Sequence, residues 1–241
     1  MLIGSEEVTL RRIGLATTKI LASQYSYHVL IGCCRVEAGE KVASKLRAAG
    51  HKATSLQLEL SPEESIKAAV GTIEKDYGYL GILISHAAVL LSHDKNLSPW
   101  EMYSKTVTPN VIGTTILTHL LLPLVRKAKA TPATIIFVSS GMGSITYAFD
   151  KSVPFYQADN RAYDSSKVAI NMLVANYHRI LELGWGKANA VCPGLVTTNM
   201  TAHMNAGAIA EISATRIVQL ATAGKDGGSG MFTDRDGVVP W

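Results

Sequence analysis

The sequence alternates short apolar runs with longer segments of helical periodicity, and this alternation constrains the fold more than any other feature. Runs of strand length, rich in β-branched residues and bounded by polar turns, occupy residues 28–34, 54–60, 80–89, 133–140 and 187–194. Apolar residues at helical spacing occupy residues 13–25, 36–50, 62–78 and 110–128, and a further helical segment begins at residue 163. Repeated strand–helix–strand units form right-handed crossovers. The sequence therefore predicts an α/β fold with a doubly wound parallel sheet, which binds ligands beyond the carboxyl ends of its strands.

Length and composition favour one buried core. The 241 residues contain no Pro-rich or Ser-rich linker and no dividing block of charge, so residues 1–241 are expected to form a single domain. Hydrophobic residues make up 47% of the chain and charged residues only 17%, which suits a sheet covered on both faces. The net charge of +4 is scattered along the chain, so no nucleic-acid partner is expected.

The cysteines and the first residues bear on the location of the protein. Cys33, Cys34 and Cys192 are odd in number, and neighbours along one strand do not easily pair, which indicates a reduced compartment. The cysteines lack C-x-x-C spacing, so no metal site is expected. Residues 1–12 contain acidic groups and no signal-like apolar run, and the other apolar stretches are strand-sized. A cytoplasmic protein without membrane contact is therefore expected.

Helix-boundary residues support the alternation. Ser61, Pro62 and Glu64 stand in the order of an N-cap, a first-turn proline and a capping-box carboxylate, which predicts a helix capped by Ser61. Gly50 follows the preceding helical pattern at the place of a C-cap glycine.

A tyrosine and a lysine stand one helical turn apart. Tyr163 and Lys167 are spaced Y-x-x-x-K at the start of a helical pattern, so their side chains share one helix face. Tyrosine, with an ordinary pKa of about 10, is a poor base at neutral pH, and a neighbouring ammonium is expected to lower that pKa. Ser140 stands at the end of a predicted strand, where its hydroxyl could bind the same substrate oxygen that the tyrosine would protonate. Asn110, in the preceding long helix, adds a polar group that faces the strand ends. The Y-x-x-x-K spacing alone is equally compatible with a plain pair on a helix surface.

These residues, together with C-P-G-L-V-T-T at 192–198, resemble the short-chain dehydrogenase/reductase family over residues 13–241. The resemblance implies a Rossmann-like fold and a catalytic tetrad of Asn110, Ser140, Tyr163 and Lys167. It also implies that Lys167 binds the cofactor's ribose and that the nicotinamide is contacted by Pro193, Gly194, Val196 and Thr198. The ending MFTDRDGVVPW resembles the last strand and tail of carbonyl-reductase-like members, where the tail packs or helps to shape the substrate pocket.

The chain departs from the family at the first turn, which normally reads T-G-x-x-x-G-x-G. When the motif is registered on Ile13 and Gly14, Val8 and Arg12 stand at the first two glycine positions. Another alignment uses residues 1–4 as a stub of the first strand, followed by a loop longer than the motif needs. Either way the first strand is truncated or altered, and only Gly14 survives of the glycines. Ile13 and Gly14 are therefore the expected contacts of the diphosphate.

Further positions bear on the cofactor. Arg35 follows the second strand, where the family places an arginine near the ribose 2′-phosphate, and no acidic residue ends that strand, which implies NADP. Glu59 stands where the family usually has an aspartate against adenine. The family's N-N-A-G element reads Ser85-His86-Ala87-Ala88, so His86 and Ala87 are expected at the cofactor. His86 is either an acid/base that titrates near neutrality or a hydrogen-bonded structural group.

The resemblance implies an oxidoreductase that reduces a carbonyl or oxidises an alcohol of a small molecule with NADP(H). Tyr147, Phe155, Tyr156 and Met204 lie in segments expected to build the pocket and favour an apolar or aromatic substrate. Because the cofactor motif is altered, two alternatives stay open: a redox-neutral cyclase, isomerase or dehydratase that no longer depends on the cofactor, and a non-enzymatic binding protein. Family members are commonly dimers or tetramers, so a homodimer or homotetramer through residues 110–125 and 168–181 is expected.

Overall fold

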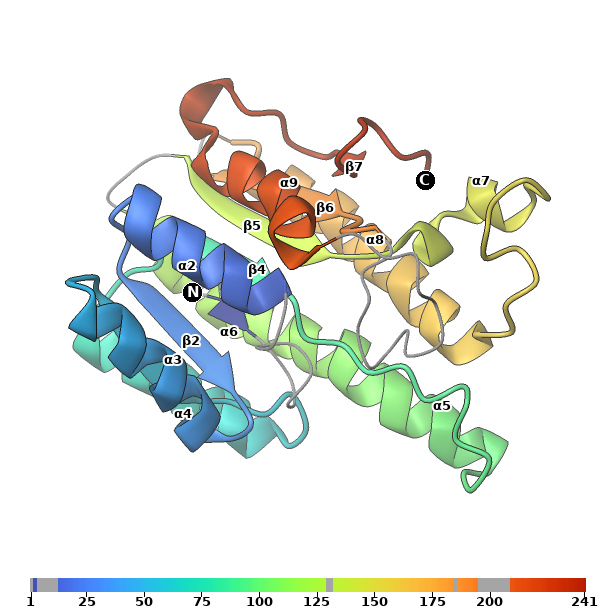
Figure 1. The fold of residues 1–241 in the computed structure, drawn as a ribbon, viewed down its shortest axis with the longest axis horizontal. Coiled ribbons are helices and arrows are strands. Elements are labelled where there is room, and N and C mark those ends of the chain that lie inside the picture. Colours follow the sequence, from blue (N-terminus) through green and yellow to red (C-terminus); the bar gives the residue numbers. More distant parts are fainter. Residues whose placement is uncertain (1, 4–12, 129–131, 184–185, 195–208) are drawn as a thin grey trace.

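The computed structural model describes residues 2–3, 13–128, 132–183, 186–194 and 209–241. These residues form a seven-stranded sheet of order β3-β2-β1-β4-β5-β6-β7, and neighbouring strands are parallel. The chain winds outward from β1 to β3 and then returns to place β4 beside β1, which confirms the predicted doubly wound α/β fold (Figure 1). The strands are β1 (Leu2–Ile3), β2 (Val29–Cys33), β3 (Ala53–Gln57), β4 (Ile82–Ser85), β5 (Ala133–Val138), β6 (Gly186–Val191) and β7 (Phe232–Thr233).

The first strand is a stub of 2 residues in the middle of the sheet. It lies between β2 and β4, where Leu2 pairs with Ile31 on one side and Ile84 on the other. The structure thus agrees with the alignment that places the first strand in residues 1–4. Residues 4–12, which include the altered turn, lie outside the described residues.

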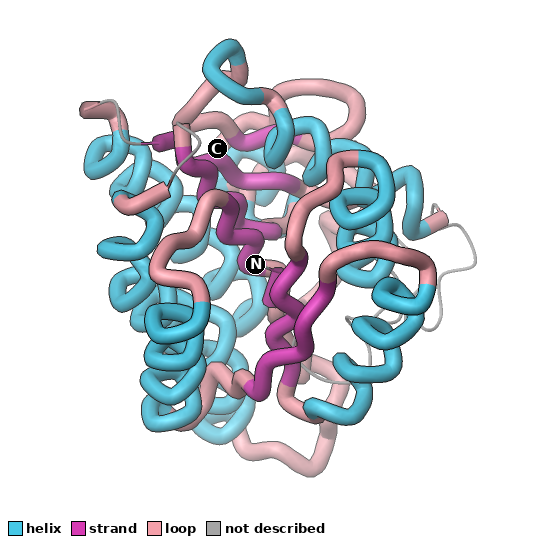
Figure 2. Tube along the Cα trace, turned by 90° about the vertical axis from the view of Figure 1, so that its left-hand side faces the viewer, coloured by secondary structure: helices cyan, strands magenta, loops and turns pink. Residues whose placement is uncertain are grey.

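Helices cover both faces of the sheet. One layer consists of α2 (Ile13–Gln24), α3 (Val36–Ala48) and α9 (Ala210–Thr222), which share one apolar core with the strands. The opposite layer contains α4 (Glu63–Asp76), α6 (Thr114–Arg126) and α8 (Arg161–Leu181), which share a second core. Figure 2 shows the strands with helices on either side. Because both faces are covered, the strands appear in the sequence as nearly continuous apolar runs.

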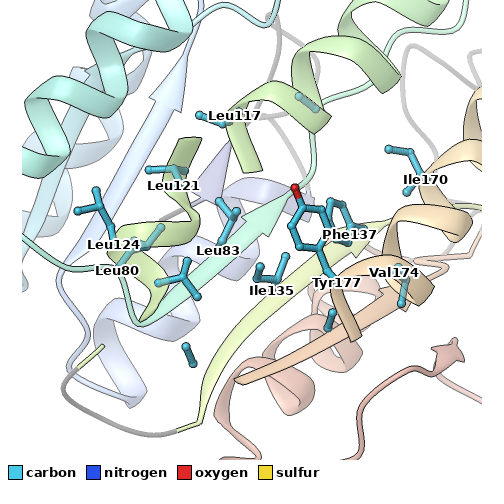
Figure 3. Close-up of a cluster of buried hydrophobic side chains, with 14 of the residues drawn as sticks. Leu80, Leu83, Leu117, Leu121, Leu124, Ile135, Phe137, Ile170, Val174 and Tyr177 are labelled. Carbon is cyan, nitrogen blue, oxygen red and sulfur yellow. The ribbon is translucent and has the colours of Figure 1, made fainter. Parts of the chain in front are cut away.

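Strand β5 contributes to both cores. Ile135 and Phe137 belong to the core beneath α6 and α8, whereas Ile136 and Val138 belong to the core beneath α2 and α9. This alternation follows from the two-residue period of a strand. In the first core, shown in Figure 3, the ring centres of Phe137 and Tyr177 lie 5.9 Å apart. Packing on both faces fixes the carboxyl end of β5, from which the site is built.

The predicted cap at Ser61 does not form. Helix α4 begins at Glu63, with Pro62 as an N-cap that has no side-chain hydrogen bond. The hydroxyl at this turn comes from Ser65, which accepts a hydrogen bond from Glu59 N at 2.8 Å. At the other predicted boundary, Gly50 adopts a φ of +85° after α3, as expected for a glycine at a helix C-terminus.

The same sequence pattern, S-P-x-E, does form a capping box before α5 (Pro99–Val107). Ser98 Oγ accepts a hydrogen bond from Glu101 N at 3.3 Å, and Glu101 Oε2 accepts one from Ser98 N at 2.9 Å. The two bonds satisfy main-chain donors at the start of the helix, which fixes where α5 begins.

Helix α5, the π-helical turn η1 (Thr108–Gly113) and α6 form one continuous helix from Pro99 to Arg126. By length and composition alone this helix is apolar enough to cross a membrane, with a mean hydropathy of 1.3 over an 18-residue window. The expectation that apolar stretches are all strand-sized is therefore wrong here. Its apolar residues have a structural use, since Leu117, Leu121 and Leu124 are buried in the core beneath α6.

Candidate active site

The first turns of α8 carry Tyr163 and Lys167 on its buried face. The two residues are 8% and 3% exposed, and Lys167 Nζ lies 5.4 Å from the centre of the Tyr163 ring. Nζ donates a hydrogen bond to the main-chain oxygen of Val138 at 2.8 Å, which ties the ammonium to the end of β5. The structure therefore brings the tyrosine and the lysine together where that strand ends.

Burial dominates the protonation of this pair. It raises the pKa of the Tyr163 phenol, and a hydrogen bond with Ser140 opposes this shift only in part. Burial also lowers the pKa of Lys167 to about 8. The pKa shift of Tyr163 thus has the opposite sign to the expected one, because loss of hydration outweighs the hydrogen bond with Ser140. A phenol with a raised pKa stays protonated near neutral pH, so Tyr163 can act as a proton donor.

Ser140 follows β5 and caps the 3-10 turn η2 (Gly141–Gly143). Its Oγ accepts a hydrogen bond from Met142 N at 3.2 Å, so the main chain orients the hydroxyl. The hydrogen bond with Tyr163 brings together two hydroxyls from different elements. The preceding Ser139 is buried and donates to Asn171 Oδ1 at 2.7 Å, which leaves Ser140 as the serine of the pair that contacts the tyrosine.

Asn110 lies in η1, and protein groups hold its carboxamide. Oδ1 accepts a hydrogen bond from Val89 N at 2.8 Å, while Nδ2 donates to Val89 O at 2.9 Å and to Ser166 Oγ at 3.0 Å. Ser166 in turn donates to Tyr163 O at 2.6 Å. In these contacts Asn110 is a positioning residue, which joins the segment after β4 to the first turn of α8. Its location agrees with the tendency of π-helical turns to occur at functional sites.

His86 directly follows β4. Both of its ring nitrogens are shielded from solvent and have no hydrogen-bond partner among the described residues, and the same holds for Ser85 Oγ. Burial, together with the charge of Lys167, lowers the pKa of His86 to about 3. The lowered pKa does not fit the expected acid/base that titrates near neutrality, and within the described residues the imidazole has no hydrogen-bond partner. Buried polar atoms of this kind need a partner, which a ligand or a water molecule can provide.

Two residues that sequence reasoning missed hold η2 against α8. Asn171 Nδ2 donates to Gly143 O at 2.9 Å, while its Oδ1 binds Ser139. At Gly143 an added Cβ would lie 2.8 Å from Lys167 Cβ, so only glycine allows this close approach. Both positions left a signal in the sequence: Asn171 lies one turn after Lys167 on the same helix face, and Gly143 belongs to a G-x-G that follows the serine pair.

Of the side chains expected in the substrate pocket, Tyr147 and Phe155 lie together next to Gly141, the residue that follows Ser140. Their ring centres are 6.4 Å apart, and an atom added at Gly141 would meet the Phe155 ring at 3.1 Å. We call these two rings the ring wall. The side chain of Tyr156 is exposed to solvent, and Met204 lies outside the described residues.

Comparison with known proteins identifies this arrangement. The family model described as short chain dehydrogenase matches residues 10–208 of the chain. The chain belongs to the short-chain dehydrogenase family. The resemblance drawn from the sequence is thereby confirmed, and the chain belongs to a family of oxidoreductases.

Relatives of this short-chain dehydrogenase cover most of its length. The short-chain dehydrogenase anuI of Penicillium roqueforti is 32% identical over 215 residues, which span 88% of this chain and 85% of the relative. NADPH carbonyl reductase 1 of Sus scrofa is 26% identical over 269 residues, spanning 95% of this chain and 90% of the relative. A solved NADPH-bound carbonyl reductase from chicken fatty liver has the same fold, with a TM-score of 0.81 at 23% identity over 100% of this chain and 99% of that one.

The residues expected on the adenosine side of the cofactor follow β1, β2 and β3. Ile13 and Gly14 form the buried first turn of α2, after the unusual turn of this short-chain dehydrogenase. Arg35 is exposed and is the N-cap residue of α3, and Glu59 is half-buried after β3. These positions lie at the carboxyl ends of the strands, where a doubly wound sheet binds its ligands.

The other residues expected at the cofactor follow β4 and β6, and those after β6 are the expected nicotinamide contacts. Ala87 is buried after His86. Pro193 and Gly194 follow β6, and Gly194 has a φ of +74°, a conformation that favours glycine. The remaining two expected contacts, Val196 and Thr198, lie outside the described residues. Within the described part of the chain, no group of at least 3 His, Cys, Asp or Glu side chains could hold a metal ion.

Proposed function

We propose that this short-chain dehydrogenase reduces the carbonyl group of a small apolar or aromatic molecule, or oxidises the corresponding alcohol, with NADP(H). The convergence of Tyr163, Lys167 and Ser140 at the carboxyl end of β5 carries this proposal. The carbonyl reductase among its relatives supports the reaction class. The apolar ring wall beside Gly141, the residue after Ser140, supports the substrate class.

The buried polar atoms after β4 suit a cofactor that carries ribose hydroxyls. Both ring nitrogens of His86 and Ser85 Oγ need hydrogen-bond partners, and an alcohol group can both donate and accept. The ammonium of Lys167 has three donors, one of which binds Val138 O. In this assignment Lys167 and His86 hold ribose. Gly14, in the first turn of α2, lies near the diphosphate, and Arg35 pairs with a 2′-phosphate.

The residues of the chain divide the proton chemistry between them. The cofactor, when bound, supplies or accepts a hydride. During reduction Ser140 Oγ donates a hydrogen bond to the carbonyl oxygen, and Tyr163 gives its proton to that oxygen as negative charge develops there. The Lys167 ammonium then stabilises the phenolate that remains, because an opposite charge nearby favours the ionised form.

Titration of the purified chain with NADPH, followed by cofactor fluorescence or calorimetry, tests the proposal. We expect saturable binding and turnover of aromatic aldehydes, measured as loss of NADPH absorbance. NADH, which lacks the 2′-phosphate, serves as the comparison ligand. Arg35→Ala should weaken binding of NADPH more than binding of NADH. Absence of NADPH binding at millimolar concentration would refute the proposal and favour a redox-neutral proton-transfer enzyme on the same residues.

We also propose that two copies of the chain associate through α5, η1 and α8. Helices α5 and α8 pack against each other, and they and η1 carry large apolar residues that remain exposed. Clustered exposed apolar residues mark protein contact surfaces. Light scattering after size exclusion should give a dimer or tetramer, and a monomer at micromolar concentration would refute this arrangement. The exposed residues are Trp100, Tyr103, Ile112, Met172 and Ile180.

A further inference from the structure

The segment after β7, residues 234–241, folds back along that strand. The side chain of Asp234 accepts main-chain hydrogen bonds at 2.8 and 3.0 Å from the next turn, which reverses the chain. An antiparallel bridge follows, and Val239 N then donates to Phe232 O at 2.8 Å. This tail segment is therefore held against the edge of the sheet that β7 forms.

Trp241 joins the tail segment to α7 (Ile145–Ala148). Its main-chain oxygen accepts two hydrogen bonds from Thr146, at 3.0 Å from the main-chain N and at 2.8 Å from Oγ1. Its ring centre lies 5.5 Å from that of Phe232 in β7. Trp241 is thus fixed to the sheet by its ring and to α7 by its carbonyl. We call the contact between Thr146 and Trp241 the latch.

Helix α7 leads directly to the reacting groups. It follows η2, the turn that Ser140 caps, and Ser144 connects the two elements. Ser144 N donates to Gly141 O at 3.0 Å, and Ser144 Oγ accepts from Tyr147 N at 3.1 Å. Tyr147 belongs to the ring wall that packs beside Gly141. The position of α7 therefore sets the position of this wall.

Strand β7, from which the tail segment extends, also connects back to the site. Thr233 O accepts a hydrogen bond from Cys192 N at 2.8 Å, and Cys192 Sγ accepts one from Gly141 N at 3.2 Å. The contacts therefore form a closed circuit, from Gly141 through Cys192 and β7 to the latch, and from the latch through α7 back to Gly141. The latch is a solvent-exposed link of this circuit, whereas the bond at Cys192 is partly buried. Water can compete for an exposed hydrogen bond, so loss of the Thr146 hydroxyl, or of the Trp241 ring that holds the main-chain oxygen in place, is expected to weaken the latch.

We propose that Thr146 and Trp241 determine substrate selectivity by holding the ring wall in place. This inference rests on the proposed carbonyl reduction. With the latch closed, the wall stands against Gly141, the residue after Ser140, and favours flat aromatic carbonyl compounds. When the latch opens, α7 and the wall move outward, so flat substrates bind less tightly and bulkier ones enter. Both are positioning residues, since they act through Tyr147 and Phe155.

Steady-state kinetics of the full chain with benzaldehyde and with a bulky aryl ketone test the inference. Thr146→Val and Trp241→Ala should each raise KM for benzaldehyde about tenfold, while its kcat changes by less than about twofold. The ratio of kcat/KM for ketone to that for aldehyde should rise. Thr146→Ser, which keeps the hydroxyl, should restore the wild-type ratio. Thr72→Val is the matched control, because Thr72 Oγ1 also binds a main-chain oxygen, that of Ala68, on the distant helix α4.

Hydrogen exchange provides a readout that does not depend on turnover. In both latch variants the amides of residues 145–150 should exchange faster, whereas Thr72→Val should leave them unchanged. If hydrogen exchange at residues 145–150 were unchanged in both variants, the proposal that the latch holds α7 in place would be refuted. Faster exchange with an unchanged ratio of kcat/KM would overturn its role in selectivity and leave the tail segment with a packing role. A wild-type chain that neither binds nor reduces any carbonyl compound would overturn the proposed function, and the inference with it, even where the exchange result holds.

Discussion

Lys167 Nζ lies 5.4 Å from the centre of the Tyr163 ring, while its hydrogen bond goes to the main chain of β5. The strand, rather than the phenol, therefore positions the ammonium. Tyr163, whose pKa is raised by burial, keeps its proton until a substrate oxygen takes it. Lys167 then faces the negative charge that the transfer leaves behind. The two residues act at different moments, so their variants should fail in different ways.

Tyr163→Phe should remove most turnover and preserve the fold. Only a hydroxyl is lost, and a positioned proton donor contributes roughly 10²- to 10⁴-fold to rate. We expect kcat to fall by at least about 10²-fold, with NADPH affinity within about twofold of wild type. Tyr25→Phe, after α2, removes a hydroxyl from an exposed tyrosine outside the proposed dimer contact and serves as the control. Wild-type kcat in the Tyr163 variant would show that the proton comes from elsewhere.

Reduction should weaken as pH rises through about 8. Burial lowers the pKa of Lys167 to about 8, so the cation is present below that pH and is lost above it. Because the cation stabilises the phenolate, kcat/KM should decline on the alkaline side. Lys167→Arg should be slower overall but should lack this decline, since a guanidinium stays protonated. A wild-type profile that stays flat to about pH 10 would contradict this role of the ammonium.

His86 should contribute to cofactor affinity without adding a pH dependence near neutrality. His86→Ala removes the polar atoms that lack partners and should weaken NADPH binding about tenfold, whereas His86→Asn keeps a donor and an acceptor and should stay close to wild type. His119→Ala, at an exposed position of α6, is the control. Because the pKa of His86 is lowered to about 3, wild type and His86→Asn should show the same pH profile of NADPH binding between about pH 5.5 and 7.5. A step near pH 6.5 in wild type alone would contradict the assignment.

Sequence patterns predicted the fold well where structure depends on local periodicity. Apolar runs of strand length and the helical spacing between them placed strands β2 to β6 and most helices within a few residues. Local patterns predicted the first residues of helices less well. Ser61 and Ser98 share the pattern S-P-x-E, yet of the two only Ser98 caps a helix, since α4 begins at Glu63 with Pro62 as its N-cap residue. Whether a serine caps the helix depends on the path of the chain that precedes it, and a pattern of four residues does not predict that path.

The candidate site shows the same division. Spacing predicted that Tyr163 and Lys167 share a helix face, and the structure brings them together. The direction of the tyrosine pKa shift could not be predicted from spacing, since it depends on how much water the fold removes. The same holds for Asn110, whose carboxamide is bound to Val89, a residue from a different element. Tertiary packing decides such contacts, so family motifs identify the residues but not their environment.

Gly143→Ala should damage the site through packing alone. The added methyl group would lie 2.8 Å from Lys167 Cβ and 3.0 Å from Lys167 C, so η2 and α8 must move apart. Overpacking of this kind costs about 1–3 kcal/mol in free energy of unfolding, and the shift separates Ser140 from Tyr163. Urea unfolding should therefore show a lower midpoint, together with reduced kcat. Gly71→Ala is the matched control, because a Cβ there meets nothing within 4 Å in the exposed interior of α4. It should stabilise the chain by about 0.5–1 kcal/mol through helix propensity, so equal effects of the two substitutions would contradict a close contact between η2 and α8.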